Sequence, residues 1–111
     1  MDTFIGQLTG LRLCSTFMAD DEFEWDDAKA ASNYVNHGVT FDMASGVFRD
    51  PFAVDWLDDR EAYGEARYVT IGMVDGRLLY VAYTMRDDRI RIISARGAEP
   101  HERRQYHEDG A

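Results

Sequence analysis

The chain lacks the features that indicate disulfides, membrane insertion or a bound metal. It has one cysteine, Cys14, so no internal disulfide can form, and a reducing cytoplasm is the compartment we expect. No apolar run approaches the roughly 20 residues needed to cross a membrane, so we predict no membrane contact. No Cys or His pair has the spacing of metal ligands, and no glycine-rich phosphate loop is present. We therefore expect neither a metal nor a cofactor.

Positive charge is scarce and unevenly placed. The net charge is −9, from 21 acidic and 12 basic residues, which argues against a general nucleic-acid binder. Residues 1–66 hold 14 acidic and 4 basic side chains, a net of −10, whereas residues 67–111 hold 7 and 8, a net of +1. Lys29 is the only lysine, so the basic residues of the second half are all arginines, whose rigid fork suits phosphate or carboxylate. The acidic half is either a face for a basic partner or a solubilising surface.

The length and composition predict one ordered domain. The chain has 111 residues, of which 45% are hydrophobic, enough to form a core without covalent or metal support. Convincing patterning begins only after about residue 22. We expect residues 1–22 to be an extension that is disordered or weakly docked, and residues 23–108 to form the domain.

Two helix patterns lie in the first half. Asp26 is expected to cap a helix from Asp27 to about Asn36, which Gly38 ends in the left-handed conformation. Thr40 begins a second, shorter helix with apolar residues at helical spacing, and Asp50-Pro51 stops it.

The second half predicts an antiparallel meander. Residues 67–74 and 77–84 alternate as strands around Asp75-Gly76, the strongest short hairpin signal. A polar turn over 85–88 leads to a third strand, residues 89–96.

Further elements complete the predicted fold. Residues 23–25 and 52–57 are strand candidates, and Pro100 begins a short charged helix to about His107. This order predicts an α+β fold, with two N-terminal helices packed on one face of a small antiparallel meander and a short C-terminal helix.

Several short motifs occur in an order and spacing typical of one family. They are Phe23-Glu24-Trp25-Asp26, Lys29, Asn33, His37-Gly38-Val39, Asp50-Pro51, Arg67, Gly76-Arg77-Leu78-Leu79, Arg91-Ile92-Ile93-Ser94-Ala95-Arg96 and Tyr106. Together they resemble the BrnT toxins. The resemblance implies a RelE-like fold and a ribonuclease that arrests translation by acting on RNA. It also implies a partner, a BrnA-type antitoxin that carries a DNA-binding domain. The protein itself would be linked to DNA only through that antitoxin.

RNA can be cleaved without a metal when a protein supplies a base, an acid and cations for the phosphate. The meander should bring Arg67, Arg86 and Arg91 to one end of the sheet, where they are candidates for holding the phosphate. Lys29 and His37 are candidates for assisting catalysis. The alternative for the arginines is a set of cross-strand ion pairs, and the alternative for His37 is a helix cap.

Three further residues are candidates for substrate binding, namely Arg77, Ser94 and Arg96. Arg77 and Arg96 should lie at the end of the sheet opposite to the other arginines. Strict alternation places Ser94 with Ile90 and Ile92 on one face and Arg91 on the other. Ser94 is expected to hydrogen-bond locally rather than act as a nucleophile.

Two other functions fit the sequence. The chain departs from the family pattern at Asn36, Met85 and Gly97, where relatives commonly carry lysine, an acidic residue and another basic residue. With the acidic first half, these departures support a catalytically weakened toxin that binds its antitoxin and modulates operon repression. An acidic domain whose arginines are purely structural is the third interpretation.

Overall fold

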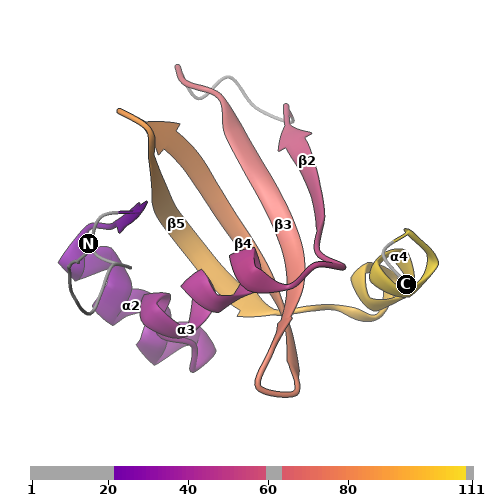
Figure 1. The fold of residues 1–111 in the computed structure, drawn as a ribbon. Helices are drawn as coiled ribbons and strands as arrows, with labels where there is room; N and C mark the ends of the chain where they lie inside the picture. The colour runs from indigo at the N-terminus through magenta and orange to yellow at the C-terminus, as the bar shows by residue number, and fades with distance from the viewer. Residues whose placement is uncertain (1–21, 60–63, 110–111) are drawn as a thin grey trace, which may run out of the picture.

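The fold is built on one five-stranded sheet (Figure 1). The computed structural model describes residues 22–59 and 64–109, so the expected extension, apart from Glu22, lies outside the described residues. The elements in chain order are β1 (Phe23–Glu24), α2 (Asp27–His37), α3 (Phe41–Ser45), the 3₁₀ helix η2 (Gly46–Arg49), β2 (Val54–Asp58), β3 (Arg67–Val74), β4 (Arg77–Arg86), β5 (Arg89–Gly97) and α4 (Pro100–Asp109). The strand order across the sheet is β1-β5-β4-β3-β2.

The predicted α+β class is confirmed, but the sheet is mixed rather than purely antiparallel. β3, β4 and β5 form the predicted meander, and β2 extends it antiparallel to β3. On the other side β1 runs parallel to β5, pairing Phe23 with Ile90 and Glu24 with Arg91. β1 and β5 are far apart in sequence, so no hairpin turn fixes their relative direction.

The helix ends follow the predicted local chemistry. The Asp26 carboxylate accepts hydrogen bonds from the backbone N–H groups of Ala28 and Lys29, at 2.9 and 3.1 Å. Gly38 ends α2 with φ = +69°, a conformation that glycine adopts without a steric penalty. Thr40 caps α3 by accepting a hydrogen bond from the Met43 N–H at 3.0 Å.

One close approach seats the second helical segment on the sheet. α3 tightens into η2, which lies against β3 at Gly72. A Cβ on Gly72 would lie 2.9 Å from the Cβ of Val47, so glycine is required for this contact.

Both hairpin turns contain two residues with positive φ. Asp75 and Gly76 have φ of +48° and +81°, as expected for a tight primed turn. Asp87 and Asp88 have φ of +53° and +65°, so the second turn is shorter than the predicted loop and β4 continues through Arg86. Aspartate tolerates this conformation better than most residues.

The two faces of the sheet carry separate cores. One face, which we call the helix face, is covered by α2, α3 and η2 over the buried residues Phe23, Val39, Phe41, Ala44, Val47, Leu79, Val81, Ile92 and Ala95. The opposite face, which we call the arginine face, has a smaller core of Ile71, Leu78 and Tyr106, with Trp56 and Tyr80 packed against it. In Figure 1, α2 and α3 cross one side of the sheet, and α4 lies apart from them beside β2 and β3.

A buried amide joins α2 to the sheet. The Asn33 side chain donates to the backbone carbonyl of Ala95 at 2.8 Å and accepts from the Ala95 N–H at 3.0 Å. It also donates to the carbonyl of Val39 at 3.0 Å. Because β1 covers β5 only at Ile90 and Arg91, Asn33 supplies the pairing that a neighbouring strand would otherwise give at Ala95.

We expect Asn33→Ala to lower the free energy of unfolding by about 2–4 kcal/mol, because it leaves buried backbone groups unpaired. Urea denaturation measures this change. Asn36→Ala, at an exposed position one turn along α2, is the matched control and should change stability by less than about 0.5 kcal/mol. Equal stability of the two variants would show that Asn33 does not hold α2 on the sheet.

Candidate functional site

A row of charged residues crosses the arginine face at the end of the sheet where β2 and β4 end and β3 and β5 begin. The ladders pair Asp58 with Arg67, Thr84 with Arg91, and Arg91 with Glu24. The ladder that pairs Tyr68 with Tyr83 continues so that Arg67 lies beside Thr84. Directly paired residues project from the same face, so Arg67 and Arg91 flank Thr84 in one row.

Carboxylates already contact the arginines at this end of the sheet. Arg91 Nη1 lies 3.0 Å from Glu24 Oε2, and Arg89 Nε lies 3.8 Å from Glu24 Oε1. Arg86 pairs with Glu65 at 3.3 Å, and both side chains are more than one third exposed. The sequence analysis missed Glu24, although its alternation between Phe23 and Trp25 was a signal that it faces away from the core.

The structure brings Arg67, Arg86 and Arg91 to one end of one face, as the meander predicted. Arg86 is paired with Arg89 and lies two residues beyond Thr84, next to the Asp87-Asp88 turn. Arg77 begins β4 beside the Asp75-Gly76 hairpin, at the opposite end, and is exposed.

A bulge in β5 corrects the predicted face of Ser94 and sets the face of Arg96. The register shifts between Ala82 and Tyr83, so Ile93 is an extra residue in β5. Ser94 therefore lies opposite Ala82 and Arg96 opposite Tyr80, on the face that carries Arg91. Strict alternation was wrong here because one unpaired residue reverses every later side chain.

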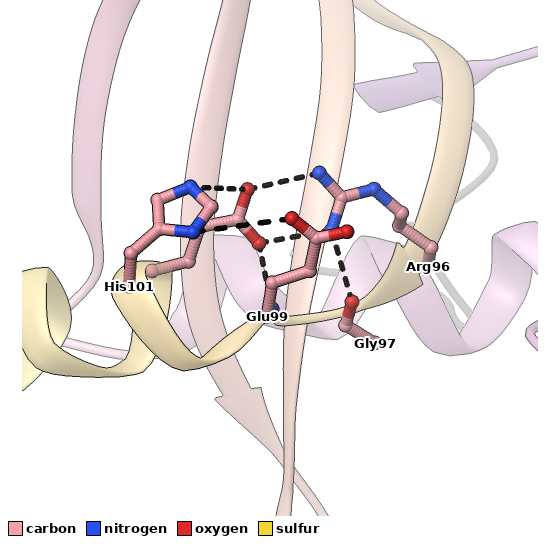
Figure 2. Close-up of polar contacts among 5 residues, drawn as sticks. Arg96, Gly97, Glu99 and His101 are labelled. Atoms are coloured by element: carbon pink, nitrogen blue, oxygen red, sulfur yellow. Dashed lines mark hydrogen bonds and ion pairs between the residues drawn. The ribbon is translucent and has the colours of Figure 1, made fainter.

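Arg96 anchors α4 to the sheet. Its guanidinium forms two hydrogen bonds of 2.9 Å to the Glu102 carboxylate (Figure 2). It also lies 3.9 Å from the centre of the Tyr80 ring. The hydrogen bonds that Arg96 donates to Glu102 raise the pKa of Arg96. Glu102 is buried, at 4% exposure, whereas the Arg96 side chain is 30% exposed, so the carboxylate is the shielded partner of the pair. These contacts favour a structural role for Arg96.

His101 lies beside this pair, 3.9 Å from Glu99 and 3.8 Å from Glu102 (Figure 2). Glu99, His101 and Glu102 hold potential ligand atoms within 4.8 Å of one another. Both oxygens of Glu102 already accept hydrogen bonds from Arg96, so we assign no metal to this group.

Lys29 and His37 lie together, but apart from the arginine row. They line a shallow cleft of about 290 Å³ between α2 and β5, with Ala28, Ser32, Asn33, Asn36 and Ile93. No residue of the row lines this cleft. Arg91 is nonetheless close enough to the start of α2 to help lower the pKa of Asp26, behind the larger effect of the Lys29 N–H.

The sequence matches the model of one protein family. The matched residues are 25–102, most of the chain, and the family is described as the ribonuclease toxin, BrnT, of type II toxin–antitoxin systems. The chain belongs to the BrnT family. No curated protein sequence matches it. The BrnT match includes Arg67, Arg91 and the Lys29–His37 cleft, whereas Glu24 and Tyr106 lie outside it.

No helix among the described residues of this BrnT chain is long and apolar enough to cross a membrane.

The last helix of the BrnT chain is held by two acidic residues whose pKa values are lowered. Burial raises the pKa of Asp50, but hydrogen bonds from the Met73 N–H, the Tyr106 hydroxyl and the Phe52 N–H outweigh it. Burial likewise raises the pKa of Glu102, and the hydrogen bonds from Arg96 outweigh it. Tyr106 Oη lies 2.7 Å from Asp50 Oδ2.

These shifts predict acid destabilisation. A carboxyl group whose pKa is lowered in the folded protein stabilises the fold fully at a pH above its ordinary pKa, which is 3.8 for Asp50 and 4.5 for Glu102. This stabilisation is lost as the pH falls through the lowered pKa of the folded protein. We expect Tyr106→Phe to cost about 1 kcal/mol at pH 7, measured by urea unfolding, and less at pH 3. Tyr34→Phe, at an exposed tyrosine of α2, is the control. A cost for Tyr106→Phe that does not change with pH would contradict this account.

Proposed function

We propose that this BrnT-family protein is an endoribonuclease whose arginine row binds the phosphate of the RNA bond that is cleaved. The observation that carries the proposal is the placement of Arg67 and Arg91 on either side of Thr84, on one face and in one row. Arg67 on β3 and Arg91 on β5 are separated by β4, and guanidinium groups on such long side chains can contact different oxygens of one phosphate. Arg86, at the same end of the face, would add charge from the turn.

The proposed reaction needs no metal. The 2′-hydroxyl of the RNA attacks the adjacent phosphorus, the bond to the 5′-oxygen breaks, and a cyclic phosphate remains. Arginines stabilise the negative charge that develops on the phosphate oxygens. Glu24, now 3.0 Å from Arg91, would exchange its place with the phosphate when RNA binds.

Lys29 and His37 are the proposed assisting residues. They line a cleft on the outer side of β5, in which Ile93 lies two residues from Arg91. An RNA strand that crosses this edge of the sheet would meet both groups. His37 would transfer a proton, and Lys29 would add positive charge. Ser94 and Arg77 would contact RNA outside the bond that is cleaved, Ser94 from the arginine face.

The biological setting follows the family. We infer a RelE-like fold, arrest of translation through RNA cleavage, and neutralisation by a BrnA-type antitoxin. That antitoxin would bring the protein to operator DNA, which the chain itself would not contact. The family description, a ribonuclease toxin of a type II system, supports these inferences.

A second function is supported by the ion pairs. Arg86, Arg91 and Arg96 each have a carboxylate within 3.3 Å, and the net charge is −9. A chain in which those acids outcompete RNA would be a weakened toxin that binds its antitoxin and modulates operon repression.

The double variant Arg67→Ala/Arg91→Ala tests the ribonuclease. We expect at least a ~100-fold loss of RNA cleavage in vitro and loss of growth arrest on induction without antitoxin. Arg103→Ala/Arg104→Ala removes the same charge from exposed positions of α4 and should retain both activities. If the wild type neither cleaves RNA nor arrests growth while it binds antitoxin, the second function is the correct one.

His37→Gln tests the cleft. Because the side chain would transfer a proton, we expect cleavage to fall about 100-fold while the affinity for uncleavable 2′-O-methyl RNA stays within threefold. Ser32→Ala changes a neighbour in the same cleft and should leave the cleavage rate unchanged. If His37→Gln cleaves RNA at the wild-type rate, His37 has no role in proton transfer and serves only at the end of α2.

A further inference from the structure

An apolar pocket opens on the helix face, at the end of the sheet that no helix of residues 22–59 or 64–109 covers. Its volume is about 440 Å³, and it is lined by Asp55, Trp56, Leu57, Tyr68, Tyr83 and Met85. We call it the tyrosine pocket. Leu57 and Met85 are 53% and 49% exposed. Figure 1 shows β2, β3 and β4 extending past α3 at this end. Neighbouring exposed apolar side chains of this size mark an interaction site.

The floor of the tyrosine pocket is fixed before any partner arrives. The rings of Tyr68 and Tyr83 stack with centroids 5.5 Å apart, and Phe48 meets Tyr83 edge-on at 4.9 Å. The Tyr83 hydroxyl donates a hydrogen bond of 2.6 Å to Asp55. Burial, followed by the Asp55 carboxylate, raises the pKa of Tyr83, so the hydroxyl keeps its proton at neutral pH. A preformed pocket lowers the entropy cost of binding.

The charge of the tyrosine pocket selects the kind of occupant. Among the described residues that line it, Asp55 is the only one with a formal charge. Asp55 comes from the first half of the chain, which is strongly acidic. RNA would be repelled. A second copy would bring two chains of net charge −9 together. The complementary ligand is an apolar side chain with a lysine or arginine beside it.

The neighbouring sheet edge adds a means of recognition. Within the described residues, β2 is the outermost strand on this side of the sheet, and three of its residues line the tyrosine pocket. An extended segment can pair with such an edge and place alternate side chains over one face.

We propose that the tyrosine pocket binds the antitoxin, through a segment with an apolar side chain next to a cation. The proposal rests on the toxin–antitoxin role of the family for the identity of the partner, and on the pocket for the site and its chemistry. The arginine face stays free of this contact, because the tyrosine pocket opens on the opposite face of the sheet.

The double variant Leu57→Glu/Met85→Glu tests the docking site without disturbing buried residues. Calorimetry with the purified antitoxin of the same operon should show at least a ~30-fold weaker Kd, because two charges enter an apolar contact. Co-expressed antitoxin should no longer prevent growth arrest. Tyr34→Glu/Val35→Glu adds the same charge at apolar positions on α2 that are 58% and 81% exposed, and should bind within threefold of the wild type. Asp55→Asn should reduce the salt dependence of Kd.

Three results separate the proposals. Wild-type affinity of Leu57→Glu/Met85→Glu for the antitoxin overturns the docking site. A wild type that elutes as a dimer, with the double variant monomeric and still binding antitoxin, assigns the pocket to self-association and also overturns it. If the wild type does not cleave RNA but the double variant loses antitoxin, the ribonuclease proposal fails and the docking site stands.

Discussion

The fold depends on one amide placed where a strand is missing. β5 would have a free outer edge beyond Arg91, since β1 is only two residues long. Asn33 occupies that edge at Ala95 and at the same time holds the carbonyl of Val39, at the start of the segment that leads to α3. A single side chain therefore fixes both the distance of α2 from the sheet and the position at which the chain enters α3. The helix-face core and the Lys29–His37 cleft both follow from that placement.

Carboxylates explain how an acidic protein keeps arginines within a sheet. Glu24 contacts Arg89 and Arg91, Glu65 contacts Arg86, and Glu102 holds Arg96. The acids come from β1, the segment before β3, and α4. Arg86, Arg91 and Arg96 are thus positioned by three different parts of the chain, and Arg89 shares Glu24 with Arg91. The buried, bidentate Glu102 pair is structural, whereas the more exposed pairs of Arg86 and Arg91 can exchange partners with a ligand at lower cost.

Local chemistry was sufficient to predict the caps, the Asp75-Gly76 hairpin and the common end of Arg67 and Arg91. These features depend on residues within a few positions, or on the direction of strands joined by tight turns. Asn33 and the parallel pairing of β1 were not predictable in this way, because their partners lie more than 60 residues away. No glycine or proline in the sequence indicated the bulge at Ile93, so Ser94 was assigned to the wrong face. The tyrosine pocket needed three strands in register before it could be recognised.

The bulge also makes the length of β5 a parameter of the fold. Deletion of Ile93 would restore strict alternation along the strand. Each later residue would still lie opposite its present partner on β4, and no residue before Ile93 would change its partner. With an added residue instead, Arg96 would turn toward the core of the helix face and Ala95 toward α4. The number of residues in this strand therefore decides whether Ala95 faces α2 and Arg96 faces α4. Related chains that gain a residue here would have to change both helices to remain folded.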